Sequence, residues 1–289
     1  MRWEGQRRSE NVEDRRGLRV PGGAGGAGIG TIVVVMLISW VTGVNPLLLF
    51  QAADGIGSMT GGSQAPQTVP TGAPSNDPQA EFAAVVLGDT EDTWTRIFQQ
   101  GGERYQPPTL VLFSDAVESA CGTNSAAVGP FYCPVDRKVY IDLSFYRELD
   151  QQFGAPGDFA QAYVLAHEVG HHVQTLLGVS ERVMQLRQRA SEVESNQLSV
   201  LQELQADCFA GVWGHHAARK SLLDPGDVEE GLKAAASIGD DTIQRRGRGR
   251  VSPESWTHGS SEQRVQWLRR GLEQGSVEAC DTFGQRSSR

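Results

Sequence analysis

Apolar and polar positions follow two different spacings along the last three quarters of the chain. Short apolar runs typical of strands occur at Thr109–Phe113 and at Pro130–Cys133 and Val139–Phe145, which flank the turn-forming sequence PVDRK. Elsewhere the apolar residues recur at helical spacing. Helices are therefore predicted over Gln79–Leu87, Thr90–Gln100, Asp158–Leu177, Glu181–Ala190, Asn196–Arg219, Asp227–Ser237 and Ser261–Gln274. A small strand region with one hairpin, followed mostly by helices, predicts the α+β fold class.

The first quarter of the chain differs because one long apolar stretch interrupts it. No charged residue occurs between Arg19 and Asp54, and residues 29–50 read IGTIVVVMLISWVTGVNPLLLF. As a helix these 22 residues would reach roughly 33 Å, compared with about 30 Å for the hydrocarbon core of a bilayer. We expect a single transmembrane helix over 28–50, ended or kinked by Asn45-Pro46. A cleaved signal peptide is the alternative, but its apolar region would be shorter.

The arginines before this segment predict its orientation. Six of them precede it, at positions 2, 7, 8, 15, 16 and 19, whereas the next basic residue is Arg96. Because basic residues favour the cytoplasmic side, we expect residues 1–27 to form a cytoplasmic N-terminal tail and the remaining chain to lie outside. Residues 51–78 carry almost no large apolar side chain and are typical of a disordered, flexible linker. The folded domain would then comprise residues 79–289.

Charge and cysteine content narrow the possible functions. The net charge of −9 argues against a general nucleic-acid binder, and the basic run Arg245–Arg250 is more typical of a solvated loop. The four cysteines show no C-x-x-C spacing, which excludes the common structural zinc knuckles. An even number outside the cytoplasm favours disulfides, and easy closure of local loops favours the pairs Cys121–Cys133 and Cys208–Cys280. Four free thiols are expected if the orientation is wrong.

The sequence His167-Glu168-Val169-Gly170-His171 carries the strongest chemical signal, because it lies inside a predicted helix. Four residues advance a helix by about 400°, so His167 and His171 project from one face, one turn apart. Two imidazoles in that arrangement can share a zinc ion at about 2.0–2.1 Å. Glu168 can reach a water held by the metal and is the expected general base. His172 points away from this face and is not expected to be a ligand.

A third metal ligand must come from elsewhere in the chain. The spacing of the metzincins would require Gly and His where Gln174 and Leu177 stand, which excludes that class. We favour Glu203 on a later helix, because Asp207 follows one turn on and can accept the free N–H of a ligand histidine. Other candidates stay open at this stage, namely Glu192, Glu194, His215 and His216.

His258 precedes the last predicted helix and is a candidate catalytic residue. Its side chain could reach the metal or stabilise a developing oxyanion. The alternative is an incidental histidine beside a Ser-capped helix start.

Seven sequence blocks occur in order along nearly the whole chain, namely MRWEGQRRSENVEDRRG, GPFYCP, YIDLSF, AHEVGHHVQ, LQADCFAGVW, THGSSEQR and CDTF. Together they resemble a bacterial family of membrane-anchored neutral zinc metallopeptidases. The chain is also similar to the wider gluzincin class, in which H-E-x-x-H precedes an E-x-x-x-D helix. This resemblance implies a zincin-like domain, with zinc held by His167, His171 and Glu203, and with His258 as the late histidine. It also implies attachment to the bacterial cytoplasmic membrane, and the positions of the arginines would then place the catalytic domain outside.

The expected activity is that of a zinc-dependent metalloendopeptidase acting on peptide or protein substrates, with Glu168 as base. A catalytically silent, zinc-stabilised binding module anchored to the membrane is the alternative, although such a module would not need Glu168. A metal-dependent amidase is a third option. The residue types alone do not separate Zn²⁺ from Mn²⁺ or Co²⁺.

Overall fold

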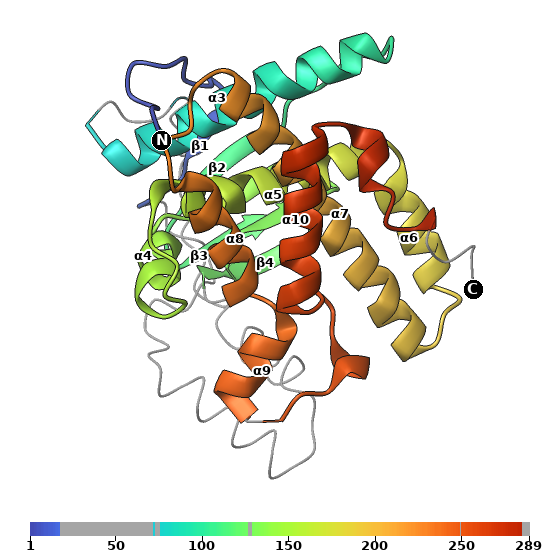
Figure 1. Ribbon diagram of the computed structural model, residues 1–289. Helices are drawn as coiled ribbons and strands as arrows, with labels where there is room; N and C mark the ends of the chain where they lie inside the picture. Colours follow the sequence, from blue (N-terminus) through green and yellow to red (C-terminus); the bar gives the residue numbers. More distant parts are fainter. Residues whose placement is uncertain (18–71, 73–75, 127–128, 249, 285–289) are drawn as a thin grey trace, which may run out of the picture. The chain divides into compact units, whose positions relative to one another are not determined.

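The computed structural model describes residues 1–17, 72, 76–126, 129–248 and 250–284 (Figure 1). The predicted transmembrane segment 28–50, and most of the predicted linker 51–78, lie outside these residues. Among the described helices, none combines the length and the apolar character that a membrane span requires.

The described chain contains a four-stranded sheet. Its strand order is β1 (Val12–Asp14), β2 (Thr109–Phe113), β6 (Lys138–Asp142) and β5 (Phe131–Cys133). The strands β1, β2 and β6 run parallel, whereas β5 pairs antiparallel with β6 as the predicted hairpin requires. Two further strands, β3 (Ala116–Ser119) and β4 (Gly122–Ser125), form a separate antiparallel ribbon.

The period of two in β2 divides its side chains between two apolar clusters. Leu110 and Leu112 point into the main core with the helices, and both are fully buried. Val111 and Phe113 point to the other face, where they pack with Tyr140 of β6 in a smaller cluster. Burial on both faces explains why this strand reads as a continuous apolar run.

Helices make up most of the remaining structure, which agrees with the predicted α+β class. Their bounds are α3 (Pro78–Gln100), α4 (Ser144–Gln151), α5 (Asp158–Leu176), α6 (Val179–Arg187), α7 (Glu192–Arg219), α8 (Asp227–Ser237), α9 (Asp240–Arg248) and α10 (Ser261–Gln274), with short 3₁₀ turns η2 (Pro253–Ser255) and η3 (Val277–Cys280). Most of the run predicted as a basic loop continues α9, where Arg245 pairs with Asp241 one turn earlier.

Helix α3 joins the two short helices that the sequence predicted around Gly88. A Cβ at position 88 would lie 2.9 Å from the carbonyl oxygen of Arg7, because the N-terminal segment crosses the helix there. The glycine therefore permits a close backbone approach and does not end the helix.

Helices α5 and α7 also approach closely, which positions the candidate site. A Cβ at Gly170 would lie 2.9 Å from the carbonyl oxygen of Ala206, so the backbones pass with no side chain between them at this point. Gly170 lies within the H-E-x-x-H sequence, and Ala206 lies between Glu203 and Asp207. The contact therefore brings the two predicted ligand-bearing segments together.

The first sixteen residues belong to the same compact unit as the described chain from residue 76 onward. Strand β1 pairs with β2, with Val12 opposite Leu110 and only 1% exposed. The carboxylate of Glu91 in α3 is 6% exposed and accepts hydrogen bonds from Ser9 at 2.6 Å, Asn11 at 2.8 Å and Arg7 at 3.0 Å. These contacts make Met1–Arg16 part of the folded domain.

The placement of these residues corrects the prediction that 1–27 form a separate tail on the other side of a membrane. A single crossing between residues 17 and 76 would put β1 and β2 on opposite sides, which is incompatible with their pairing. Five of the six arginines that suggested a cytoplasmic tail lie in the described residues, at positions 2, 7, 8, 15 and 16. They form ion pairs with the domain or within the segment, including Arg7 with Glu91 and Arg16 with Asp77.

Both predicted disulfides are present. Cys121–Cys133 ties the ribbon of β3 and β4 to the edge strand β5, and Cys208–Cys280 ties α7 to η3. The latter joins residues 72 positions apart, close to the point where α7 contacts α5.

Candidate metal centre

Helix α5 places His167 and His171 as the sequence predicted. The helix is preceded by Gly157, with φ of 120°, and is followed by Gly178, with φ of 73°. His167 is 7% exposed and His171 is half-buried, and their ring centroids lie 4.8 Å apart. Both rings turn their Nε2 atoms toward α7.

Glu203 of α7 completes a three-residue group with these histidines. Its Oε2 lies 3.1 Å from Nε2 of His167, and its Oε1 lies 3.4 Å from Nε2 of His171. Donor atoms of all three residues lie within 4.8 Å of one another. Tetrahedral ligands at zinc distances are about 3.3 Å apart, so the observed spacings fit the spacing of a zinc site.

The structure does not bring the other candidate ligands into this group. His215 donates from Nδ1 to the carbonyl of Leu272 at 2.9 Å, and His216 donates from Nε2 to the carbonyl of Gly275 at 3.2 Å. Glu194 forms the capping box of α7 with Ser191. Glu192 lies in the first turn of the same helix.

Asp207 lies where the sequence predicted a partner for a ligand histidine. It is fully buried, and its Oδ1 accepts from Nδ1 of His167 at 2.8 Å and from the hydroxyl of Tyr163 at 2.5 Å. Its Oδ2 accepts from Nε of Arg264 at 2.8 Å. The Nδ1 contact fixes the ring of His167 and leaves Nε2 for a metal. Tyr163 lies one turn before His167 on the same helix, so helical spacing could have identified it as a neighbour of this histidine.

Gln174 plays the same part for the second histidine, a role that sequence reasoning missed. Its Oε1 lies 3.0 Å from Nδ1 of His171, and its amide donates to the carbonyl of Gln202 at 2.7 Å and to Oε1 of Gln205 at 3.1 Å. The amide orientation is therefore fixed by α7. Gln174 lies three residues after His171, and from the sequence this position indicated only that the chain is not a metzincin.

Charges around the group strongly favour a bound cation. Burial opposes ionisation of Asp207, but Arg264 and His167 outweigh it and lower the pKa of Asp207 to about 2. Burial likewise opposes protonation of His167, but Asp207 and Glu203 raise the pKa of His167 to about 10. When both histidines are neutral, the two negative charges of Asp207 and Glu203 therefore exceed the single positive charge of Arg264. A nitrogen and carboxylate donor set with that excess fits a divalent metal ion.

The group opens into a cleft of about 1200 Å³. Glu168 lines this cleft beside the two histidines, is 8% exposed, and has a pKa raised chiefly by burial. His258 lines the same cleft from the loop before α10. The structure therefore brings the predicted base and the predicted late histidine to the same opening.

His258 is oriented by a residue that the sequence reading missed. The Oδ1 of Asp240 lies 3.3 Å from Nδ1 of His258, and its Oδ2 accepts the backbone N–H groups of Thr257, His258 and Gly259 at 2.8, 2.6 and 2.9 Å. The hydrogen bond to Asp240 is the main reason that the pKa of His258 is raised. Asp240 lies 18 positions away, so no local spacing linked the two residues.

His172 is outside the metal group, as predicted, but it is buried and does not lie at the surface. It is fully buried, and its ring lies 3.0 Å from the hydroxyl of Tyr132 and 2.6 Å from the carbonyl of Gln106. Burial is the main reason that the pKa of His172 is lowered to about 4. The contact ties edge strand β5 to helix α5.

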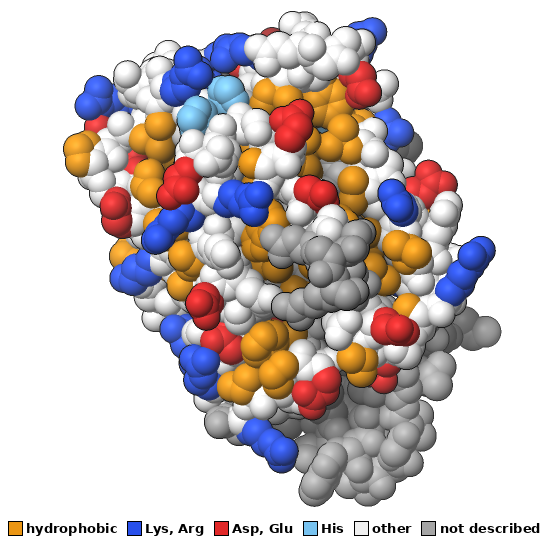
Figure 2. All heavy atoms as spheres, turned by 45° about the vertical axis from the view of Figure 1, so that its right-hand side comes forward, with side chains coloured by type: hydrophobic (Ala, Val, Ile, Leu, Met, Phe, Trp, Pro, Cys, Tyr) orange, Lys and Arg blue, Asp and Glu red, His pale blue; other side chains and the backbone are white. Residues whose placement is uncertain are grey.

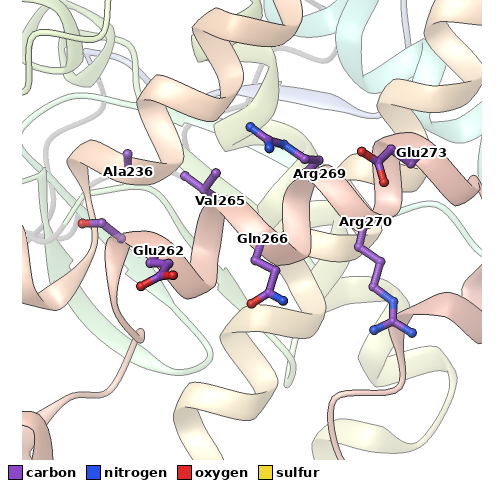
Figure 3. A pocket seen from close by; sticks show the side chains of 8 residues that line it. Ala236, Glu262, Val265, Gln266, Arg269, Arg270 and Glu273 are labelled. Atoms are coloured by element: carbon purple, nitrogen blue, oxygen red, sulfur yellow. The ribbon is translucent and has the colours of Figure 1, made fainter.

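Two other features of the described chain are less suited to catalysis. A hollow of about 680 Å³ lies over α8 and α10, lined by alternating charges such as Glu262, Arg269 and Glu273, and contains none of the predicted site residues (Figure 3). A second acidic group consists of Asp158, Asp227 and Glu230. Two of its members bind the α-amino group of Met1, which lies 2.8 Å from Asp158 and 3.2 Å from Asp227.

Comparison with known proteins places the chain in a family. Residues 1–283 match the family described as "putative neutral zinc metallopeptidase", and the chain belongs to that family. The match includes Met1–Arg16, in agreement with their place in the fold. Among its relatives, the uncharacterized protein YpfJ of Escherichia coli K12 is 47% identical over 297 residues, covering 99% of each chain. The uncharacterized protein Rv2575 of Mycobacterium tuberculosis H37Rv is 42% identical over 224 residues, covering 74% of this chain and 73% of its own. No solved structure shows a significant match.

Proposed function

We propose that the protein is a zinc-dependent peptidase that hydrolyses peptide bonds in the cleft beside α5. The observation that carries this proposal is the convergence of His167, His171 and Glu203 next to Glu168 at one opening. These three residues would hold the metal through two Nε2 atoms and a carboxylate. When bound, zinc supplies Lewis acidity and lowers the pKa of water toward 7.

Glu168 is the proposed general base. Its carboxylate would take a proton from the attacking water and deliver it to the nitrogen of the leaving amine. Burial raises the pKa of Glu168, which makes its protonated form less costly between these two transfers.

His258 is the proposed stabiliser of the oxyanion that develops on the scissile carbonyl. Asp240 raises the pKa of His258 and so favours its protonated form, which can donate a hydrogen bond to that oxygen. The side chain of His258 is 51% exposed, so a substrate can reach it from the cleft.

The edge strand β5 is the proposed contact for the substrate backbone. It pairs only with β6 among the described strands, and Phe131 and Tyr132 line the same cleft as the metal group. An extended peptide could add to this edge as a further strand. The contact between Tyr132 and His172 would hold that strand at a fixed place relative to α5.

The test is hydrolysis by the full chain loaded with zinc, using a mixed peptide library and the Glu168→Gln variant as control. The variant should keep stoichiometric zinc and lose activity by roughly 10²- to 10⁴-fold, since only the base is removed. Full activity in the variant would disprove the assignment of Glu168 as the general base. Absence of turnover in the parent, with unfolding on zinc removal, would instead support a silent zinc-stabilised module.

We also propose that the domain works outside the cytoplasm of a bacterium and is attached to the membrane through segment 28–50. The two disulfides support an oxidising compartment. Because β1 pairs with β2, Met1–Arg16 would lie on the same side as the domain. Reporter tags at the two ends of the chain should therefore be accessible from the same compartment, and tags accessible only from opposite sides would contradict this topology.

A further inference from the structure

Large apolar side chains are exposed around the mouth of the cleft. Among the described residues, six large hydrophobic side chains are exposed, and three of them line the cleft that holds the metal group. These are Val135 at 71%, Met184 at 55% and Ile243 at 44% exposure. We call Val135, Met184 and Ile243 the apolar rim.

The apolar rim comes from three separate parts of the chain. Val135 lies in the turn between β5 and β6, Met184 in α6 and Ile243 in α9. Exposure of such side chains is unfavourable in water, and their gathering around one opening is typical of a binding surface. Figure 2 shows hydrophobic side chains in patches between charged ones on one face of the molecule, so exposure alone does not mark a binding site. The apolar rim stands out because its residues line the same cleft as the metal group.

The interior of the cleft has the same character. Phe131 of β5 and Phe145 of α4 line it, and Phe153, Val164 and Ile238 add further apolar surface. Charged groups of both signs stand among them, including Arg187 and Glu181 of α6. A lining with both signs of charge gives little preference for the charge of a ligand, whereas the apolar surface gives a preference for apolar groups.

We propose that the apolar rim selects peptide segments with large apolar side chains, presented in extended form as in unfolded protein chains. This inference rests on the proposed peptidase function and names its substrate class. A folded protein buries such side chains, and the edge of β5 accepts only an extended backbone. The substrate would therefore be an unfolded or exposed apolar segment rather than the surface of a folded protein.

The first experiment measures binding and does not depend on turnover. The zinc-loaded full chain carrying Glu168→Gln is titrated with two labelled extended peptides, one with Leu and Phe among glycines and one with Ser in their place. The Leu and Phe peptide should bind more tightly. Adding Met184→Ser should weaken its binding about three- to tenfold, because about half of a methionine side chain remains to be buried by the ligand. Val135→Ser should act in the same direction.

The matched control is Leu186→Ser. Leu186 is 47% exposed in the same helix α6 as Met184 but does not line the cleft. It should leave the ratio of the two dissociation constants unchanged. Zinc content and melting temperature are measured for every variant, so that loss of the fold is recognised.

The outcomes separate this inference from the proposed function. Hydrolysis by the parent with equal binding of both peptides would overturn the apolar preference and leave the peptidase standing. Preferential binding that Met184→Ser removes, without hydrolysis by the parent, would support the rim and overturn the peptidase. A change in oligomeric state in Met184→Ser, with unchanged peptide binding, would show that the rim is an interface between copies of this chain and would overturn the inference.

Discussion

Replacement of Val12 by Ala tests whether the N-terminal segment is part of the folded domain. Val12 is 1% exposed and pairs with Leu110 in the sheet. The substitution removes two buried methyl groups, each worth about 0.8 kcal/mol, and leaves a small cavity. The free energy of unfolding should therefore fall by about 2 kcal/mol in the full chain.

The assay is urea unfolding followed by circular dichroism, with the midpoint and the slope compared between variants. The slope should stay constant, so that the midpoint reports stability alone. Glu10→Ala is the matched control, because Glu10 is an exposed residue two positions earlier in the same segment. Equal midpoints for the parent and Val12→Ala would refute the reasoning and would support the prediction that residues 1–27 form a tail separate from the domain. A chain lacking residues 1–16 should lose more stability, since the buried Glu91 would lose Arg7, Ser9 and Asn11 as partners.

Three further predictions concern the metal group and its neighbours. Arg264→Gln should lower zinc affinity by about 10- to 100-fold, because Asp207 loses the ion pair that orients it, and competition with a chelator measures the change. In the metal-free protein the pKa of His167 is raised from 6.5 to about 10, so its contribution to stability is complete below 6.5 and lost as the pH rises toward 10. Melting at a series of pH values should show this loss, and a melting temperature that rises over the same window would contradict it. Asp240→Asn should lower the pKa of His258, so the alkaline limb of the rate profile should move to lower pH, and an unmoved limb would exclude protonated His258 as the stabiliser of the oxyanion.

The spacing of residues along the predicted helices was enough to predict much of the candidate site. Four residues along a helix place His167 with His171, and the same spacing places Glu203 with Asp207. The structure shows both pairs facing each other across α5 and α7. Short loop closure also gave the correct pairing of Cys121 with Cys133.

Contacts between distant segments could not be predicted in the same way. Strand β1 has only three residues, and its sequence Val-Glu-Asp shows no period that would mark a strand. Its partner β2 lies almost a hundred positions later, beyond the reach of any spacing rule. The prediction of two short helices in place of α3 failed for the same reason, since the backbone of Arg7, which passes close to Gly88, comes from that segment. Arg264 and Asp240 join the site through tertiary contacts alone.

The most direct test of the account is the zinc content of the purified full chain and of two variants, measured by mass spectrometry of the metal after dialysis. The parent should hold stoichiometric zinc, Glu203→Ala should lose most of it, and Glu192→Ala, which changes an acidic residue at the start of the same helix, should keep it. Equal zinc in all three proteins, or none in the parent, would contradict the claim that His167, His171 and Glu203 form a metal site.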